Sequence, residues 1–481
     1  MPASPLGTRL HAAILLSSVL AFSSLATPGR AAPDPGCPRI GWSEGLSHYL
    51  SPTVAFPTDD TKDLNTPDCV FHQWSWEAFV WATALVNGPG GPKSTPRFMT
   101  LPTPAQLLRS SAAVNGPPVL QLGARSHVLR GQAGYTEGAG AIVEADGNMM
   151  VSQNGYPVYA SVHMNPSYFT TANQNLIVNG GYQKGDPNRY FSVGAAVFKA
   201  TWLRLDPGQQ APSGAYVTEA QVPVLTTSVR PGQVTILPVP NKFVTVPVAL
   251  VGLHVVGYTV NHPEFLWGTF EHQLNSPAAP DNTFTPSASI SDPKTYTFYK
   301  AGTPYSQVNT AATPPQLTLN ETTQKLSPVT NAVLENATGG ENHPNGADNI
   351  KAINSQAKGS VANFPAPQRQ FASYNLIGTV WMQPNSYNLQ SDQNSATGSI
   401  SLANVTAETF FQAAKNTPAT SVQNCFTCHN PTSFNFQTPP PAKLASRLIA
   451  LSHVLSYGTA YAVPNSVTGQ TTLGARPRPK P

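Results

Sequence analysis

The sequence predicts an α+β fold that is rich in β-structure, with a large antiparallel β portion, an aromatic helix near the N-terminus and a short helical segment near the C-terminus. Three observations lead to this class. Charged residues make up only 10% of the 481 residues, and 48 residues are proline, about twice the usual share. Several β-branched runs end at Gly, Pro or Asn. A single aromatic run has helical spacing.

The N-terminus has the pattern of a secretory signal peptide. Arg9 supplies a positive charge, Leu10 to Leu25 is apolar, and small residues follow, so we expect cleavage after Ala26 or Ala31. The rival interpretation is a membrane anchor, but the apolar stretch is shorter than the roughly 20 residues that span a bilayer. We therefore expect a signal peptide at residues 1–31, a periplasmic or secreted protein, and no membrane span after cleavage.

A helix is expected to begin near residues 66–68, where Thr-Pro-Asp forms a helix start. The run FHQWSWEAFVWATAL follows, and residues 87–92, rich in Gly and Pro, end it. Its residues at helical spacing are Phe71, Trp74, Ala78 and Trp81.

Strand signals dominate between residues 115 and 275. The strongest run is 242–260, KFVTVPVALVGLHVVGYTV, in which Pro247 predicts a break or an edge position. The other predicted strands are 157–162, 191–205 and 233–239. Residues 276–365 are rich in Ser, Thr, Asn and Pro, which indicates long surface loops or a lid.

Two of the four cysteines, Cys37 and Cys69, lie early in the chain. An even pair in an oxidising compartment favours a disulfide bond. The alternative is two buried free thiols.

The other two cysteines form the motif Cys425-Phe426-Thr427-Cys428-His429. A c-type haem needs two thiols one helical turn apart, and the adjacent histidine then donates a ring nitrogen to the iron. A lone CxxC also occurs in redox pairs and zinc sites, but the adjacent histidine, the export signal and the lack of a second CxxC disfavour both. We expect one covalently attached haem c, with Cys425, Cys428 and His429 binding it.

The sixth iron ligand is open at this stage. No methionine follows residue 382, so the ligand comes from the C-terminal helix or from upstream. Each candidate also has a structural interpretation, as a core residue or a hydrogen-bonded histidine, and the sixth position can also be vacant. The candidates are His254, His272, Met382 and His453, with His163, Met164, Met149 and Met150 as further options.

Three functions fit a single haem in a large exported chain. The first is transfer of single electrons, with a redox partner protein or a small-molecule electron donor or acceptor. The second is peroxidase- or oxygenase-like chemistry on a small molecule, which needs an acid/base group. Glu264 and Glu271, near Trp267 and His272, are its best candidates. The third is binding or sensing. The net charge of +4 without a basic run argues against a nucleic-acid partner.

Several segments resemble bacterial exported monohaem c-type cytochrome-like proteins of poorly defined function. The main ones are residues 251–256 (GLHVV after a Val), residues 267–272 (WGTFEH) and the C-terminal CxxCH. The resemblance spans roughly residues 70–430. It implies one continuous unit with the haem near the C-terminus, in which His254 and His272 deserve testing.

These observations predict four parts of the chain. A signal peptide at 1–31 precedes a β-rich main domain at 32–400. A haem-attachment segment at 401–460 packs on the main domain, and it includes short helices at 404–415 and 442–457. The tail at 461–481 is expected to be disordered.

Overall fold

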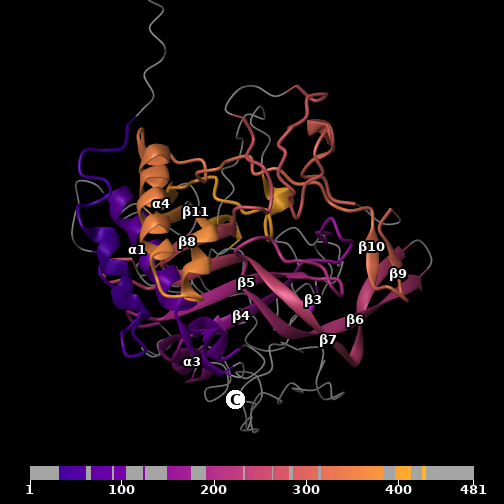
Figure 1. The fold of residues 1–481 in the computed structure, drawn as a ribbon, viewed down its shortest axis with the longest axis horizontal. Coiled ribbons are helices and arrows are strands. Elements are labelled where there is room, and N and C mark those ends of the chain that lie inside the picture. Colours follow the sequence, from indigo (N-terminus) through magenta and orange to yellow (C-terminus); the bar gives the residue numbers. More distant parts are fainter. Residues whose placement is uncertain are drawn as a thin grey trace, which may run out of the picture.

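An antiparallel sheet of eight strands forms the centre of the computed structural model (Figure 1). The structure describes residues 32–60, 67–88, 91–103, 123–124, 149–174, 191–230, 233–262, 264–280, 285–312, 316–382, 396–412 and 425–428. The predicted signal peptide, the helix at 442–457 and the C-terminal tail lie outside these residues. The α+β, β-rich class is confirmed.

The strand order in the main sheet is β12-β11-β8-β7-β5-β4-β3, and β6 pairs with β7. The main-sheet strands are β3 (Gly123–Ala124), β4 (Tyr159–Met164), β5 (Ala196–Arg204), β6 (Val217–Arg230), β7 (Gln233–Gly257), β8 (Leu266–His272), β11 (Tyr374–Met382) and β12 (Ala396–Gly398). Two small hairpins pair β1 (Leu85–Gly88) with β2 (Gly91–Pro96) and β9 (Thr318–Asn320) with β10 (Lys325–Ser327).

The α-helices are α1 (Pro67–Thr83), α3 (Pro166–Asn173), α4 (Gly346–Ala362) and α5 (Cys425–Cys428). Short 3-10 helices are η1 (Trp42–Leu50), η2 (Arg97–Thr100), η5 (Tyr305–Gln307), η6 (Gln368–Ser373) and η8 (Thr409–Phe411). Residues 404–411 therefore hold turns and the 3-10 helix η8, where the sequence predicted a short helix.

Strand β7 joins two runs that the sequence separated, because residues 233–239 and 242–260 belong to one strand. The predicted break at Pro247 does not occur. Pro247 lies opposite Glu219 of β6, and its carbonyl oxygen accepts a hydrogen bond from the backbone N–H of Leu205 at 3.0 Å. Pro247 has no backbone N–H to donate, but it still takes part in the hydrogen bonding of the sheet through its carbonyl oxygen.

The predicted aromatic helix is α1, and it is buried on nearly every side. Trp74 and Trp76 are at most 1% exposed, and the ring of Phe79 stacks on Phe270 of β8 with centroids 4.1 Å apart. A helix that is surrounded by protein must pair its polar side chains internally. The polar residues of α1, among them Asp68 and His72, therefore need partners.

Helix α4 is the main departure from the expectation of loops or a lid at 276–365. It lies beside α1 (Figure 1) and buries Ile350, Ile353, Ala357 and Val361. Their spacing of three and four residues forms one apolar stripe, but small and polar residues between them mask the pattern. The rest of the segment holds the β9–β10 hairpin, η5 and loops.

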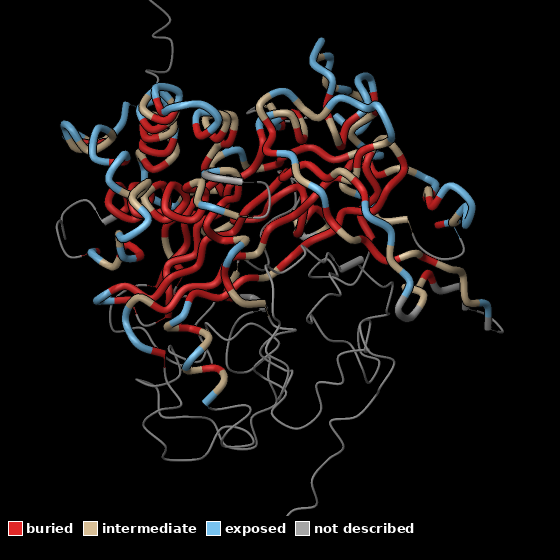
Figure 2. The backbone as a smooth tube through the Cα atoms, turned by 60° about the horizontal axis from the view of Figure 1, so that its bottom comes forward, coloured by how far each residue is buried: buried red, intermediate tan, exposed pale blue. Residues whose placement is uncertain are grey.

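Buried residues fill the middle of the molecule (Figure 2). Their apolar side chains form two clusters, one on each face of the sheet. The first, called here the α1-side cluster, contains Trp76, Phe270 and Ile353. The second, called the α5-side cluster, contains Tyr168 of α3 and Phe426 of α5. Neighbouring residues of a strand point to opposite faces, so each strand contributes to both layers.

The predicted disulfide between Cys37 and Cys69 is present, with an S–S distance of 2.05 Å. It ties the segment before η1 to the first turn of α1. Among the residues that the structure describes, no helix is long and apolar enough to cross a bilayer.

Candidate functional site

Helix α5 is the described part of the CxxCH motif, and it forms a single helical turn from Cys425 to Cys428. Phe426 is fully buried, and its ring meets the edge of Trp267 with centroids 6.0 Å apart. Cys425 is half-buried. Residues 413–424 and 429–481, which include His429 and His453, lie outside the described residues.

Three methionines share the α5-side cluster with Phe426. Met150, Met164 and Met382 are each fully buried there. The hydroxyl of Thr409 in η8 contacts the Met150 sulfur at 3.7 Å. Thioether sulfurs from three different segments therefore lie in the layer that receives α5.

His254 also faces this layer, but hydrogen bonds occupy both of its ring nitrogens. The Asn404 amide donates to Nε2 at 2.9 Å, and Nδ1 lies 2.9 Å from the Thr269 hydroxyl. The Asn404 side-chain oxygen accepts the backbone N–H of Thr406, so its amide group is held pointing at His254. His254 is thus a hydrogen-bonded histidine, and to bind iron it would have to release Asn404.

Glu271 lies in the same polar group, fully buried on β8. It accepts the backbone N–H of Val405 and, at 3.2 Å, the amide of Asn275. Burial raises the pKa of Glu271 to about 7, although these bonds oppose the shift. A buried carboxyl group with this pKa can hold or release a proton near neutral pH.

Glu264 connects the α5 contact with Met382. Its side chain is fully buried, and Oε1 lies 2.6 Å from His262 Nδ1 and accepts the Met382 backbone N–H at 3.2 Å. The Trp267 indole donates to the Glu264 carbonyl oxygen at 3.1 Å. Oε2 makes no hydrogen bond.

The other histidine candidates lie on the opposite face of the sheet. His272 packs against Tyr374 of the α1-side cluster, and burial lowers its pKa to about 4. His163 packs against Phe98 in that layer, and burial lowers its pKa to about 4 as well. The sheet therefore separates both histidines from α5.

The residues of this layer fit a c-type haem. The two cysteine positions lie at the ends of one helical turn, as thioether attachment requires. The turn is anchored by Phe426 against an apolar sheet face that contains three thioethers. These are the chemical groups that attach and surround a haem.

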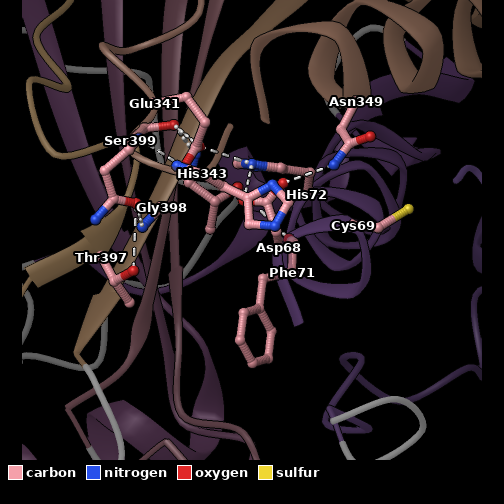
Figure 3. Close-up of polar contacts among 12 residues, drawn as sticks. Asp68, Cys69, Phe71, His72, Glu341, His343, Asn349, Thr397, Gly398 and Ser399 are labelled. Carbon is pink, nitrogen blue, oxygen red and sulfur yellow. Dashed lines mark hydrogen bonds and ion pairs between the residues drawn. The ribbon is translucent and has the colours of Figure 1, made fainter. Parts of the chain in front are cut away.

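A second polar group lies on the α1 side, around His72 (Figure 3). His72 of α1 is fully buried, and its Nε2 lies 3.2 Å from Asp68 Oδ1 and 3.1 Å from Glu341 Oε2. Burial acts against the charged imidazole, but the two carboxylates outweigh it and raise the pKa of His72 to about 9. Among the residues that the structure describes, His72 Nδ1 has no hydrogen-bond partner, and Asp68 Oδ1 has only the ion pair with Nε2.

Neutral donors hold the two carboxylates in place. The Asn349 amide of α4 donates to Asp68 Oδ2 at 2.9 Å, and the Ser399 hydroxyl donates to Glu341 Oε2 at 3.2 Å. Gly346 makes room for this arrangement, since a Cβ there would lie 1.9 Å from Glu341 Cγ. Asp34 and His343 border the group on its more exposed side.

The group around His72 was missed by sequence reasoning because its members are far apart in the chain. Glu341 lies 269 residues from His72. One local signal existed: Asp68 and His72 are four residues apart on a helix that is otherwise apolar, and such residues share a helix face.

Comparisons of the chain with protein-family profiles, with curated proteins and with solved structures found no match. The function of the chain is therefore inferred from the chemistry and geometry of its own residues.

Proposed function

We propose that this chain is an exported monohaem c-type cytochrome that passes single electrons. Cys425 and Cys428 attach the haem, and His429 is the proximal ligand of its iron. The haem supplies a ferric–ferrous couple when bound. The observation that carries the proposal is the CxxCH motif, whose cysteines begin and end one helical turn.

The surroundings of α5 support this function. Phe426 packs on Trp267, so the turn that carries the CxxC motif is held against the sheet. The α5-side cluster gives α5 apolar surroundings, since its members are fully or almost fully buried.

The predicted signal peptide and the Cys37–Cys69 disulfide support a location outside the cytoplasm, in the periplasm or secreted. The electron partner is a redox protein or a small-molecule donor or acceptor.

Haem staining of a denaturing gel tests attachment. The protein is produced with its signal sequence in cells that attach haem c. The double variant Cys425→Ala, Cys428→Ala should lose all stain, because no thiol remains to form the thioethers. The matched control is Cys37→Ala, Cys69→Ala, which removes the other cysteine pair and should keep the stain. Stain retained by the first variant would refute the proposal.

We expect Met382 to provide the sixth ligand. It is fully buried in the layer of α5, and Glu264 fixes its backbone N–H, whereas His254 already uses both nitrogens. Met382→Leu should convert a low-spin spectrum into a high-spin one, since leucine fills the space but cannot bind iron. Met150→Leu and Met164→Leu serve as controls with the same change. If Met382→Leu keeps the low-spin spectrum and Met150→Leu or Met164→Leu becomes high-spin, Met382 is not the sixth ligand and the altered methionine is.

One observation favours a second candidate, a peroxidase-like enzyme. Burial raises the pKa of Glu271 to about 7, so this carboxyl group can serve as an acid or a base near neutral pH, and Glu264 is a second buried carboxyl group near α5. A high-spin ferric spectrum in the unaltered protein and a rapid reaction with peroxide that Glu264→Gln slows would favour this enzyme over the electron carrier.

A further inference from the structure

We infer that Asp68, His72 and Glu341 form a binding site for a divalent transition metal ion such as Zn²⁺, separate from the haem segment. The site joins α1 to the turn that precedes α4 (Figure 3). The three side chains offer one imidazole nitrogen and two carboxylate oxygens, and these atoms lie within 4.8 Å of one another.

The group has too few protons for its buried carboxylate oxygens. Nε2 of His72 carries at most one proton, yet it faces Glu341 Oε2 at 3.1 Å and Asp68 Oδ1 at 3.2 Å. Asp68 is only 2% exposed, and among the described residues its Oδ1 has no partner except the ion pair with His72, whereas Glu341 Oε2 also accepts the Ser399 hydroxyl. One Nε2 proton cannot fully satisfy both carboxylates, and a buried acceptor that lacks a full hydrogen bond is costly. A cation between the three atoms would compensate both negative charges at once.

The donor atoms are spaced much as the ligands of a zinc ion are. A tetrahedral Zn²⁺ with bonds of about 2.0–2.2 Å separates its ligand atoms by about 3.4 Å. The distances from His72 Nε2 to the two carboxylate oxygens are 3.1 and 3.2 Å, roughly 0.2–0.3 Å shorter than this spacing. Nε2 therefore lies near the distance from each oxygen that a shared ion requires.

Hydrogen bonds from neighbouring groups orient both carboxylates. Asn349 donates to the outer oxygen of Asp68, and the backbone N–H of Asn342 donates to Oε1 of Glu341 at 3.1 Å. Each bond leaves an inner oxygen turned toward Nε2. Hydrogen bonds from neighbouring groups orient ligands in this way in known metal sites.

The donor chemistry selects the type of ion. Imidazole favours Zn²⁺ and similar transition metals over Mg²⁺ and Ca²⁺, which prefer oxygen alone. Across the described residues, no lysine or arginine forms an ion pair with Asp68 or Glu341. Among these residues, His72 is therefore the cationic side chain that pairs with both carboxylates, and a metal ion would compete with its proton alone.

The test is calorimetric titration of the purified, haem-loaded protein with Zn²⁺ after treatment with a chelator. We expect one Zn²⁺ per chain, and binding that is at least about tenfold weaker in Asp68→Asn and in Glu341→Gln. The controls are Glu321→Gln and His48→Gln, which change an exposed carboxylate and an exposed histidine and should leave the affinity unchanged. Circular dichroism reports whether each variant folds.

Wild-type crystals grown with Zn²⁺ give a second readout that does not depend on the variants. An anomalous difference peak between Asp68, His72 and Glu341 is expected. The absence of stoichiometric binding would overturn the inference, and so would full affinity in the folded Asp68→Asn and Glu341→Gln variants. A zinc peak, one that appears only in crystals grown with Zn²⁺, at other positions and not at this group would also overturn it, leaving the group as an ion pair. None of these outcomes depends on haem attachment, so this inference and the proposed function fail separately.

Discussion

Single residues with buried polar groups carry most of the chemistry of this protein. His163 is an instructive case, because its environment fixes its protonation. The Trp202 indole donates to the Ser161 hydroxyl at 3.1 Å, and that hydroxyl donates to His163 Nε2 at 3.0 Å. Nδ1 then carries the proton and donates to the Leu101 carbonyl oxygen at 3.3 Å. The imidazole is therefore neutral and fully paired.

The neutral state of His163 makes stability depend on pH. Burial lowers its pKa from 6.5 to about 4 in the folded protein, so between these values the unfolded chain binds a proton that the folded protein does not. The free energy of unfolding should therefore fall as the pH drops from about 6.5 to about 4, by up to about 1.4 kcal/mol per pH unit. Above pH 6.5 this contribution is fully present. Denaturant unfolding at several pH values measures the slope.

The matched variants are His163→Gln and His48→Gln, the second at an exposed position. The first should remove this part of the slope, whatever its effect on overall stability, and the second should retain it. Equal slopes in the wild type and in His163→Gln would contradict the assignment.

Residue-level prediction from the sequence worked where the chemistry is local. The CxxCH spacing and the Cys37–Cys69 pair are visible in the sequence, and the disulfide is confirmed. His254 was expected to be a ligand or a hydrogen-bonded residue, and the structure pairs both nitrogens. The distant partners, Glu341 for His72 and Met382 for Glu264, lie across the fold, so no local pattern reveals them.

At the scale of elements, periodicity predicted what was strongly apolar or aromatic. The helix α1 was found, because its tryptophans recur at helical spacing. The helix α4 was missed, because alanine, glycine and asparagine dilute its apolar stripe. Strand β7 was predicted as two runs, 233–239 and 242–260, with a break or an edge position at Pro247, whereas the structure has one strand from Gln233 to Gly257.

The packing of α4 gives a quantitative prediction. Ile353 is fully buried in the α1-side cluster, so Ile353→Ala should lower the free energy of unfolding by about 2–4 kcal/mol through lost burial and a cavity. Lys351→Ala on the exposed side of the same helix is the control and should change it by less than about 0.5 kcal/mol. Chemical denaturation measures both. An equal effect of the two changes would show that α4 does not cover the core.

The disulfide gives a second prediction at this scale. It closes a loop with a sequence separation of 32 residues, so the loop-entropy relation predicts a stabilisation of about 3–4 kcal/mol. The variant Cys37→Ser, Cys69→Ser should lose this amount in denaturant unfolding. A loss below about 1 kcal/mol would show that the bond does not restrict the unfolded chain as assumed.

At the scale of the whole molecule, the two proposed sites lie on opposite faces of one sheet and share its strands. Strand β11 borders both sites, because neighbouring residues of a strand point to opposite faces. Its Trp381 contacts the His72 ring, and its Met382 lies in the layer of α5. A continuous row of buried contacts joins the sites, running through His72, Trp381, Phe71, His262, Glu264, Trp267 and Phe426.

The class of fold was predictable because low charge, abundant proline and β-branched runs act over the whole chain. The placement of α5 was not, because Phe426 meets Trp267 across 159 positions of sequence. Tertiary packing decides which apolar face receives a short helical turn, and no local pattern encodes it.

Covalent attachment of one haem at α5 is the property on which the proposed function depends. It is tested by mass spectrometry of the exported protein after digestion. The peptide that contains Cys425 to His429 should be heavier by one haem, and no other peptide should carry one. A peptide recovered with two free or mutually bonded thiols, from cells that attach haem to a known cytochrome, would show that no haem is attached there.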